Sequence, residues 1–285
     1  MAGKLSRRRF LRTVGGSVLG LGATAIGGTA WITKVEPQLV ETTYLTLPLA
    51  NLPPAFDGIT LVQVSDWHLA DWMTLDHMLE IAHQANDLQP DILVMTGDFL
   101  TWFGSTTYDD ITRSMSAFTA KESVLAILGN HDHWTDAAKV AEAVGKATNT
   151  VLLLNEHVVL TRGNDHLYIA GVDDIWEKKN DLDRALAGIP VDSAVILLAH
   201  EPDYADEVAL SLRVGLMLSG HSHGGQVRLP FIGALVTPYL GRKYDMGLYK
   251  VGNMTLYTNR GVGMLSPNVR FNCRPEITHF TLKAV

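Results

Sequence analysis

The chain of 285 residues is 47% hydrophobic and 19% charged, so it can bury a substantial core and is neither a disordered tail nor a collagen-like repeat. Its single cysteine, Cys273, excludes an internal disulfide and any cysteine-rich zinc or iron–sulfur site. The net charge is −7, and because the first 30 residues hold five bases and no acid, the remainder is more acidic still. An acidic body argues against broad electrostatic binding of nucleic acid, so we expect no nucleic-acid partner.

The chain begins with a basic segment followed by an uncharged one. Residues 6–12 read Ser-Arg-Arg-Arg-Phe-Leu-Arg, and residues 13–33 carry no charge. A basic start before an apolar run is typical of an export signal, and the paired arginines resemble a twin-arginine (Tat) signal. We therefore predict residues 1–33 as a Tat-type signal or an N-terminal anchor, since about 20 apolar residues can also span a bilayer. We expect export by the Tat machinery to a periplasmic or other extracytoplasmic location, with this segment either cleaved or kept as a membrane anchor.

After this leader, residues 34–57 are predicted as a linker and first strand region, and residues 58–285 as one domain. Short β-branched apolar runs alternate there with segments whose apolar residues repeat at helical spacing. This alternation indicates an α/β protein with a mainly parallel sheet covered on its faces, and the many strands of the second half predict two packed sheets with helices outside. The predicted strands are residues 59–64, 91–95, 124–128, 151–154, 157–160, 167–170, 194–199, 214–218, 226–229, 248–251, 254–258 and 277–282, and the predicted helices are residues 75–85, 108–120, 135–146, 182–187 and 204–211.

Five of the predicted strands end in polar residues of one chemical kind. In open α/β sheets, ligands bind beyond the carboxyl ends of the strands, so we expect these residues to converge on one crevice. Asp, His and Asn side chains supply oxygen and nitrogen ligands suited to manganese, iron, zinc or similar divalent ions. The residues are Asp66 and His68, Asp98, Asn130 to Asp132, His200, and His221 and His223.

The spacing within these motifs favours shared ligands. Asp66 and His68 are two residues apart, so on a regular strand both side chains would face one side. Beyond the strand end both can reach a single ion, and His221 and His223 repeat this spacing. Glycine allows the tight backbone paths needed where side chains crowd around ions, and it precedes Asp98, Asn130 and His221.

In this order, the motifs resemble the calcineurin-like metallophosphoesterase superfamily, whose pattern is D-x-H, G-D, G-N-H-[DE], a lone H and G-H-x-H. The resemblance covers residues 61–225 and implies the metallophosphatase fold, a four-layer α-β-β-α sandwich of two packed mixed sheets with outer helices. It also implies two divalent metal ions, of Mn, Fe, Zn or a similar metal. One ion would be held by Asp66, His68 and His223, the other by Asn130, His200 and His221, and Asp98 would bridge them.

The resemblance further implies hydrolysis of a phosphoester. The charge of two divalent ions exceeds that of the two carboxylates, so the site would attract a phosphodiester despite the acidic body. Two ions about 3.5–4 Å apart can hold phosphoryl oxygens and activate a bridging water, whose hydroxide attacks phosphorus. His131 would protonate the leaving group or stabilise charge on the phosphoryl oxygens. Asp132 would hydrogen-bond and orient the imidazole of His131.

Further features resemble a bacterial branch of exported or membrane-associated phosphodiesterases. They are the Tat-like leader, the His-Glu-Pro-Asp run at 200–203, the Gly-rich run at 220–227 and the stretch at 258–263. Relatives in that branch include hydrolases of UDP-2,3-diacylglucosamine, which implies a phosphodiester or pyrophosphate substrate of the envelope or linked to a lipid. Residues 99–101, Phe-Leu-Thr, differ from the Asp-Arg-Gly of Ser/Thr protein phosphatases and argue against that activity. The alternatives are a phosphomonoesterase or nucleotidase, and a binding module of this fold without catalysis.

Large aromatic residues lie beside the metal motifs, among them Trp67, Trp102 and Trp134. One interpretation is an apolar rim that contacts a lipid tail or the bilayer surface, where tryptophan is favoured. The other is packing beneath the loops, because large aromatic residues are core residues more often than not.

Overall fold

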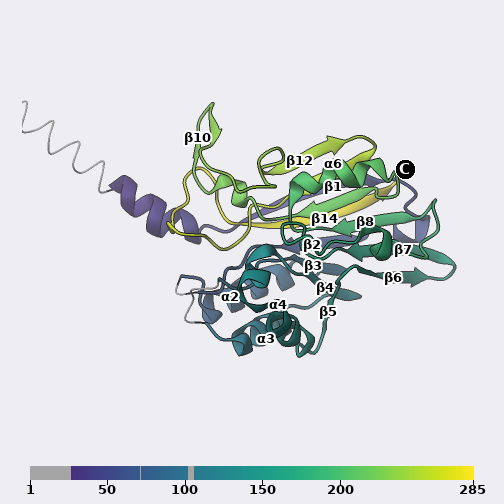
Figure 1. The fold of residues 1–285 in the computed structure, drawn as a ribbon, viewed down its shortest axis with the longest axis horizontal. Coiled ribbons are helices and arrows are strands. Elements are labelled where there is room, and N and C mark those ends of the chain that lie inside the picture. Colours follow the sequence, from purple (N-terminus) through teal and green to yellow (C-terminus); the bar gives the residue numbers. More distant parts are fainter. Residues whose placement is uncertain (1–26, 71, 102–105) are drawn as a thin grey trace, which may run out of the picture.

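The computed structural model describes residues 27–70, 72–101 and 106–285, in which two six-stranded sheets pack face to face (Figure 1). The strand order is β1-β14-β2-β3-β4-β5 in the first sheet and β12-β13-β9-β8-β7-β6 in the second. Both sheets are mixed, because β14 runs against β2 in the first, and β6 and β12 run against β7 and β13 in the second. The first sheet contains β1 (Glu41–Leu49), β2 (Thr60–Val64), β3 (Ile92–Thr96), β4 (Ser123–Ile127), β5 (Thr150–Leu152) and β14 (Glu276–Ala284). The second contains β6 (Glu156–Arg162), β7 (Asp165–Gly171), β8 (Ala194–Leu198), β9 (Leu216–Ser219), β12 (Gly247–Val251) and β13 (Met254–Thr258).

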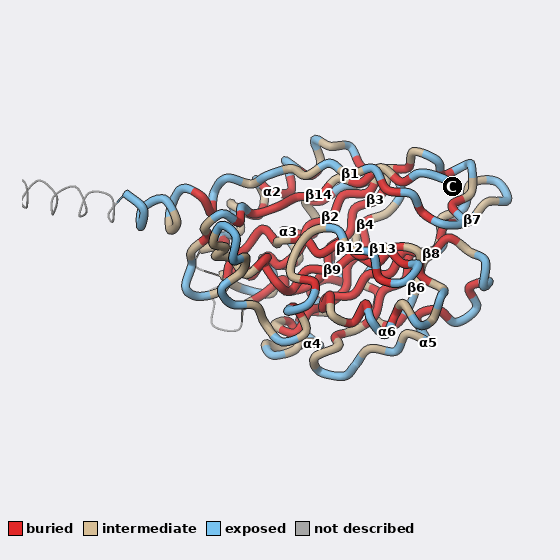
Figure 2. Tube along the Cα trace, turned by 90° about the horizontal axis from the view of Figure 1, so that it is seen from above, coloured by how far each residue is buried: buried red, intermediate tan, exposed pale blue. Residues whose placement is uncertain are grey.

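Aliphatic side chains from both sheets fill the space between them. Leu61 of β2 and Val94 of β3 belong to the same buried cluster as Leu218 of β9. Strands that are buried on both faces read as continuous apolar runs, and β3 and β8 are buried along their whole length. Figure 2 shows this buried layer through the middle of the molecule.

Helices cover the outer face of each sheet. On the first sheet lie α2 (Leu75–Asp87), α3 (Tyr108–Ala117) and α4 (Asn130–Gly145), and on the second lie α5 (Leu182–Ala185) and α6 (Ala205–Leu210). A side-chain cap fixes the start of α2, because the Thr74 hydroxyl accepts a hydrogen bond from the backbone N–H of His77. The four-layer α-β-β-α sandwich that the sequence predicts is confirmed.

Most predicted elements are found with bounds shifted by a few residues, and two differ in a way that bears on the site and its surroundings. The helix predicted at residues 135–146 begins at Asn130, and a break at Asp136 (φ −177°, ψ 91°) separates its first turn from the rest of α4. Apolar periodicity does not detect this turn because its motif residues are polar. The strand predicted at residues 226–229 is reduced to β10 (Arg228–Leu229), which pairs with β11 (Gly233–Ala234) in a small hairpin.

Residues 34–57 contain a strand that belongs to the first sheet. β1 pairs in parallel with β14 along its whole length, from Glu41 opposite Glu276 to Leu49 opposite Ala284. This pairing joins residues 41–49 to the last strand of the chain.

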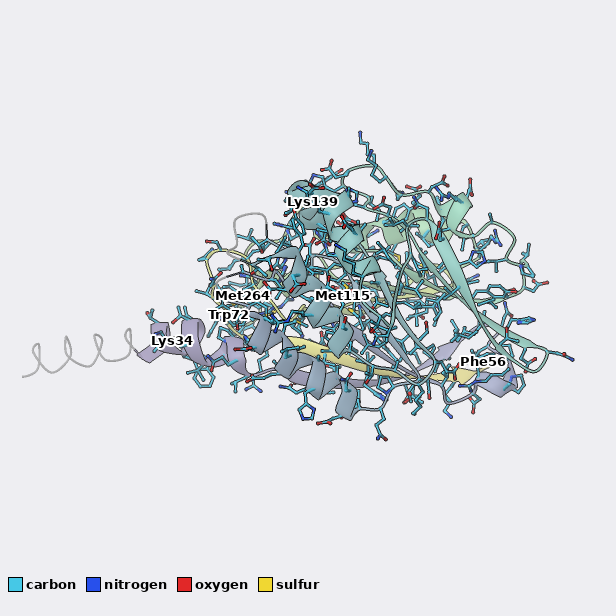
Figure 3. All side chains as sticks on the ribbon, turned by 90° about the horizontal axis from the view of Figure 1, so that it is seen from below. Lys34, Phe56, Trp72, Met115, Lys139 and Met264 are labelled. Atoms are coloured by element: carbon cyan, nitrogen blue, oxygen red, sulfur yellow. The ribbon has the colours of Figure 1, made fainter. Side chains whose placement is uncertain are left out.

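The N-terminal segment leaves the molecule at one end of its long axis. In Figure 3, Lys34, Trp72 and Met264 lie toward this end, and Phe56 lies toward the other. The paired arginines of the Tat-like leader lie outside the described residues, and within the described part no helix has the length and apolar character to cross a membrane.

Five short 3-10 or π-helical segments complete the described elements. They are η1 (Trp31–Val35), η2 (Glu36–Gln38), η3 (Pro54–Phe56), η4 (Pro202–Tyr204) and η5 (His223–Gly225).

Candidate metal centre

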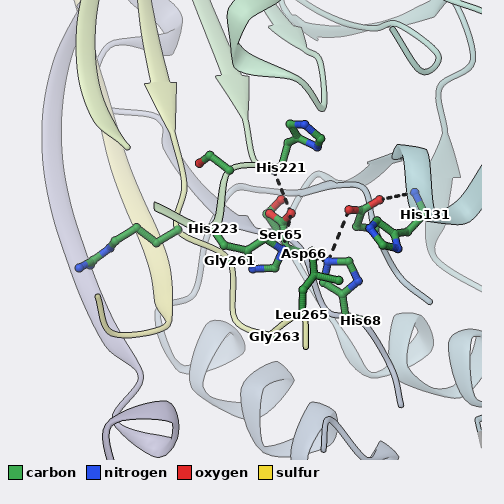
Figure 4. Close-up of polar contacts among 12 residues, drawn as sticks. Ser65, Asp66, His68, His131, His221, His223, Gly261, Gly263 and Leu265 are labelled. Carbon is green, nitrogen blue, oxygen red and sulfur yellow. Dashed lines mark hydrogen bonds and ion pairs between the residues drawn. The ribbon is translucent and has the colours of Figure 1, made fainter. Parts of the chain in front are cut away.

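Seven Asp, His and Asn side chains from five strand ends meet in one buried cluster, part of which is shown in Figure 4. None of these residues exposes more than 3% of its surface. The strands concerned are neighbours, β2, β3 and β4 in the first sheet and β8 and β9 in the second, so their carboxyl ends lie at a shared edge. The residues are Asp66 and His68 after β2, Asp98 after β3, Asn130 after β4, His200 after β8, and His221 and His223 after β9.

Ligand atoms in this cluster form two compact groups. In the first, His223 Nε2 lies 3.4 Å from Asp66 Oδ1 and 2.9 Å from His68 Nε2. In the second, His200 Nε2 lies 3.1 Å from Asp98 Oδ2. Asp98 Oδ2 is also 3.4 Å from His68 Nε2, so this carboxylate lies between the groups. Within each group the ligand atoms lie within 4.8 Å of one another, close enough to surround one cation.

Hydrogen bonds on the outer sides of two rings fix which nitrogen faces the cluster. His200 Nδ1 donates to the carbonyl of Thr96 over 2.6 Å, and His221 Nε2 donates to the carbonyl of Tyr239 over 2.7 Å. A carbonyl only accepts, so in the neutral imidazole the proton lies on the outer nitrogen and the inner one keeps its lone pair. Burial lowers the pKa of His221 to about 3, which keeps that ring neutral at pH 7. Burial alone would lower the pKa of His200, but the adjacent Asp98 carboxylate raises it well above its usual value. A neutral imidazole is the form that binds a metal, so a cation at His200 would displace the proton on its inner nitrogen.

Several buried polar atoms of the cluster have no hydrogen-bond partner among the described residues. They are Asp66 Oδ2, Asn130 Oδ1 and His223 Nδ1. A buried polar atom without a partner costs about 1–3 kcal/mol, and burial also raises the pKa of Asp66 to about 7. Cations placed among these atoms would supply partners and keep the carboxylate ionised. The donor set therefore fits divalent metal ions.

The backbone of the cluster adopts an unfavourable conformation at several positions. Five of the seven side chains belong to residues with φ between 50° and 67°, a region that residues other than glycine seldom adopt. Left-handed backbone costs about 1–2 kcal/mol per residue, and such strain concentrates at functional sites. The fold thus places these side chains at the expense of its own stability. The five residues are Asp66, His68, Asp98, His221 and His223.

Glycines leave room for the crowded side chains, as the sequence predicts. A Cβ at Gly129 would lie 2.4 Å from Asp98 Oδ1, and a Cβ at Gly220 would lie 2.3 Å from Asp66 Oδ2. The structure adds Gly261, whose Cβ would lie 2.7 Å from the Cβ of Asp66. Any side chain at these positions would displace a candidate ligand.

A buried arginine holds the loop that carries Gly261. The guanidinium of Arg270 donates to the carbonyl oxygens of Gly261 and Gly263 over 3.1 and 2.7 Å. The backbone N–H of Gly263 donates in turn to the carbonyl of Asp66 over 2.8 Å, so Arg270 supports a candidate ligand through the loop. No sequence motif includes Arg270, and residues 258–263 suggested only a family branch.

His131 lies at the cluster, but Asp132 does not orient it. The His131 ring packs edge-on against His68 with centroids 4.8 Å apart, and with His68 and Asp98 it forms a third group that could hold a metal. The predicted contact between Asp132 and this imidazole is wrong, because adjacent residues in the first turn of α4 point in different directions. The buried Asp132 carboxylate instead accepts the backbone N–H groups of Asp98, Phe99, Leu100 and Gly129 at 2.9–3.2 Å.

The tryptophans predicted to form a rim lie in different environments. The rim prediction is wrong for Trp67, which is fully buried and stacks on Phe118 with ring centroids 5.4 Å apart. Burying this large ring in the core removes more apolar surface from water than a rim position would. Trp134 is 39% exposed, and its ring lies 4.7 Å from that of His131. Trp102 lies outside the described residues.

The sequence profile of the calcineurin-like phosphoesterases matches residues 59–225, the part of the chain that contains every candidate ligand. The chain belongs to the calcineurin-like phosphoesterase family. It is therefore a metallophosphoesterase, a hydrolase of phosphoester bonds, and its family uses divalent metals.

Curated relatives match the chain along most of its length. YkuE of Bacillus subtilis, named a metallophosphoesterase, is 36% identical over 99% of both chains. YaeI of Escherichia coli, named a phosphodiesterase, is 29% identical over 98% of this chain and 99% of its own. LpxG of Chlamydia trachomatis, named a UDP-2,3-diacylglucosamine pyrophosphatase, is 26% identical over 87% of this chain and 90% of its own.

Proposed function

We propose that the chain is a binuclear metal-dependent phosphoesterase that hydrolyses a phosphodiester or pyrophosphate bond. One observation carries the proposal: Asp98 lies between two compact groups of buried ligand atoms, each suited to one cation. Mixed carboxylate, amide and imidazole ligands suit manganese, iron, zinc or a similar metal. Asp66, His68 and His223 would hold one ion, Asn130, His200 and His221 the other, and Asp98 both.

When bound, two such cations would neutralise phosphoryl oxygens and activate a water for attack on phosphorus. His131 is the residue placed to move a proton, because its half-buried ring borders the cluster and its Nδ1 has no partner among the described residues. Burial lowers the pKa of His131, so the ring is neutral in the free protein. A phosphoester anion beside the ring would raise this pKa and favour the proton that the leaving oxygen needs.

An envelope or lipid-linked substrate and an extracytoplasmic location complete the proposal. The names of two relatives specify a phosphodiesterase and a pyrophosphatase of a diacylated sugar nucleotide. The basic and uncharged segments of residues 1–33 support export by the Tat machinery and retention at the membrane. Trp134, exposed beside His131, would form part of a rim that contacts lipid.

Metal analysis combined with hydrolysis of generic esters tests the proposal. Protein stripped of metal and reloaded with Mn²⁺, Fe²⁺ or Zn²⁺ should bind two ions per chain and hydrolyse bis(4-nitrophenyl) phosphate faster than 4-nitrophenyl phosphate. Asp98→Asn should bind at most one ion and lose nearly all activity with its fold retained. Asp192→Asn, at an exposed position, is the matched control and should behave as the wild type.

Three results would contradict the proposal in different ways. Two tightly held ions in Asp98→Asn would remove Asp98 from its bridging role. Faster hydrolysis of the monoester would indicate a phosphomonoesterase, and full metal occupancy without hydrolysis of either ester would indicate a binding module.

A further inference from the structure

A cavity of about 410 Å³ opens directly beside the candidate metal centre. His221 and His223 line it, together with Val236 beside the β10–β11 hairpin on one side and Leu265 and Val269 on the other. Its surface is mainly apolar, and no Asp, Glu, Lys or Arg of the described residues lines it. The cavity therefore shares two candidate ligands with the metal centre but has a different chemistry.

Hydrogen bonds hold both sides of this cavity in place. Gln226 Oε1 accepts from the backbone N–H of Leu265 over 2.6 Å, and its Nε2 donates to the Leu265 carbonyl over 3.1 Å. On the other side, the N–H of Leu235 donates to the carbonyl of Val227 over 3.1 Å and extends the β10–β11 hairpin. A ligand that enters meets walls that are already formed, so little ordering opposes binding.

Exposed apolar side chains lie on the hairpin that forms one side. Phe231 at the hairpin tip is fully exposed, and Ile232 and Val236 are 71% and 75% exposed. Apolar groups gathered on an exposed hairpin mark a surface that meets another apolar body. The hairpin projects near the end from which the N-terminal segment leaves (Figure 1), and Pro230 and Trp31 line one shared pocket. A leader kept in the membrane would bring the bilayer to this side.

We infer that the cavity binds a hydrocarbon chain of the substrate while the phosphoester lies at the metal centre, an inference that rests on the proposed function. The cavity would hold the part of the substrate that extends from the phosphoester, and its apolar lining without charged side chains fits a hydrocarbon chain better than a charged or strongly polar group. Because His221 and His223 border both spaces, the chain is attached close to the bond that is hydrolysed. The substrate class is a lipid phosphoester or lipid pyrophosphate, and the hairpin guides its chain from the bilayer.

A homologous series of substrates tests this inference on the full metal-loaded chain. Alkyl 4-nitrophenyl phosphodiesters from methyl to dodecyl, kept below their micelle concentrations, all release nitrophenolate, so rate differences report on the alkyl group. kcat/KM should rise by up to roughly fourfold per methylene, equivalent to about 0.8 kcal/mol, and level off when the cavity is full. Rates that do not change with chain length would overturn the inference and leave the proposed function standing. No hydrolysis of any member would overturn both.

Variants of one side wall test the location. Val236→Asp should lower the dodecyl-to-methyl ratio of kcat/KM by about tenfold or more, because the chain would have to desolvate a carboxylate. Val191→Asp is the matched control, since Val191 is 72% exposed and precedes β8 at its amino end, and it should keep the wild-type ratio. Val236→Ile should also keep the ratio, because the wall stays apolar. An unchanged ratio in Val236→Asp would exclude this cavity as the site of the chain.

Discussion

Replacement of Asp132 by asparagine separates a structural role from a catalytic one. Each carboxylate oxygen accepts two backbone N–H groups, Oδ2 those of Asp98 and Gly129 and Oδ1 those of Phe99 and Leu100. These bonds join the turn after β3 to the start of α4. Asparagine keeps one acceptor oxygen but presents an amide NH₂ to the other two N–H groups, so two hydrogen bonds are lost.

The expected cost follows from those two bonds. A hydrogen bond to a charged group contributes about 1.5–3 kcal/mol, so their loss predicts a fall of about 3–6 kcal/mol in the free energy of unfolding. For a chain of this size each kcal/mol lowers Tm by about 2–4 °C, which predicts a fall of roughly 6–24 °C. Metal affinity should fall as well, because the backbone of Asp98 is one of the groups released.

Urea unfolding and thermal melting of the metal-loaded protein measure this cost. Asp136→Asn is the matched control, because this partly exposed carboxylate of the same helix pairs with Lys139 at the surface. The control should unfold at nearly the wild-type urea concentration, because an exposed ion pair contributes little to stability. If Asp132→Asn unfolds at the wild-type urea concentration, the reasoning is refuted, and the hydrogen bonds of Asp132 do not stabilise the fold as argued.

His131→Ala should keep both metals and slow hydrolysis of a diester with an alkyl leaving group by about 10²–10⁴-fold. The effect on a nitrophenyl ester should be smaller, because nitrophenolate leaves without a proton, and loss of a metal would make His131 a ligand. Arg7→Lys with Arg8→Lys keeps the charge but should block the Tat route, so cell fractionation should find the protein in the cytoplasm; unchanged export in a Tat-deficient cell would indicate a general signal or an anchor. Gly263→Ala should lower Tm, because its Cβ would lie 2.0 Å from the backbone oxygen of Trp67. Gly145→Ala is the control and should keep the wild-type Tm, because nothing lies within 4 Å of its Cβ. Equal Tm values for the two variants would show that the loop around Gly263 can move to make room.

The fold could be predicted where a local pattern decides it. β3 and β8 are continuous apolar runs, which is typical of strands buried on both faces. The start of α4 could not be predicted from apolar spacing, because Asn130 and its neighbours are polar and form a turn that tertiary contacts stabilise. The β10–β11 hairpin could not be predicted either, because two strands of two residues each are too short to show a periodic pattern in the sequence.

For the site, too, the sequence predicts some features and not others. Its residues could be expected to meet, because the carboxyl ends of neighbouring strands share an edge whatever the details of packing. The direction of each side chain could not be predicted, because it depends on the surrounding backbone. Trp67 and Asp132 therefore point away from their predicted places, and Arg270 acts through carbonyl oxygens that no sequence pattern reveals.

Left-handed backbone is concentrated at the centre, which contains five of the 14 described non-glycine residues with positive φ. Side chains from several strands reach one point only if the chain turns sharply where each strand ends, and a left-handed residue or a glycine makes such a turn. Gly220 leaves space for Asp66, and the histidines that follow it, His221 and His223, adopt φ of 67° and 51°. The Gly-His-x-His motif thus encodes a backbone path as well as ligand chemistry. Helix and strand propensities oppose that path, so interactions at the cluster must offset its cost, and cations bound to its unpartnered oxygen and nitrogen atoms would supply such interactions.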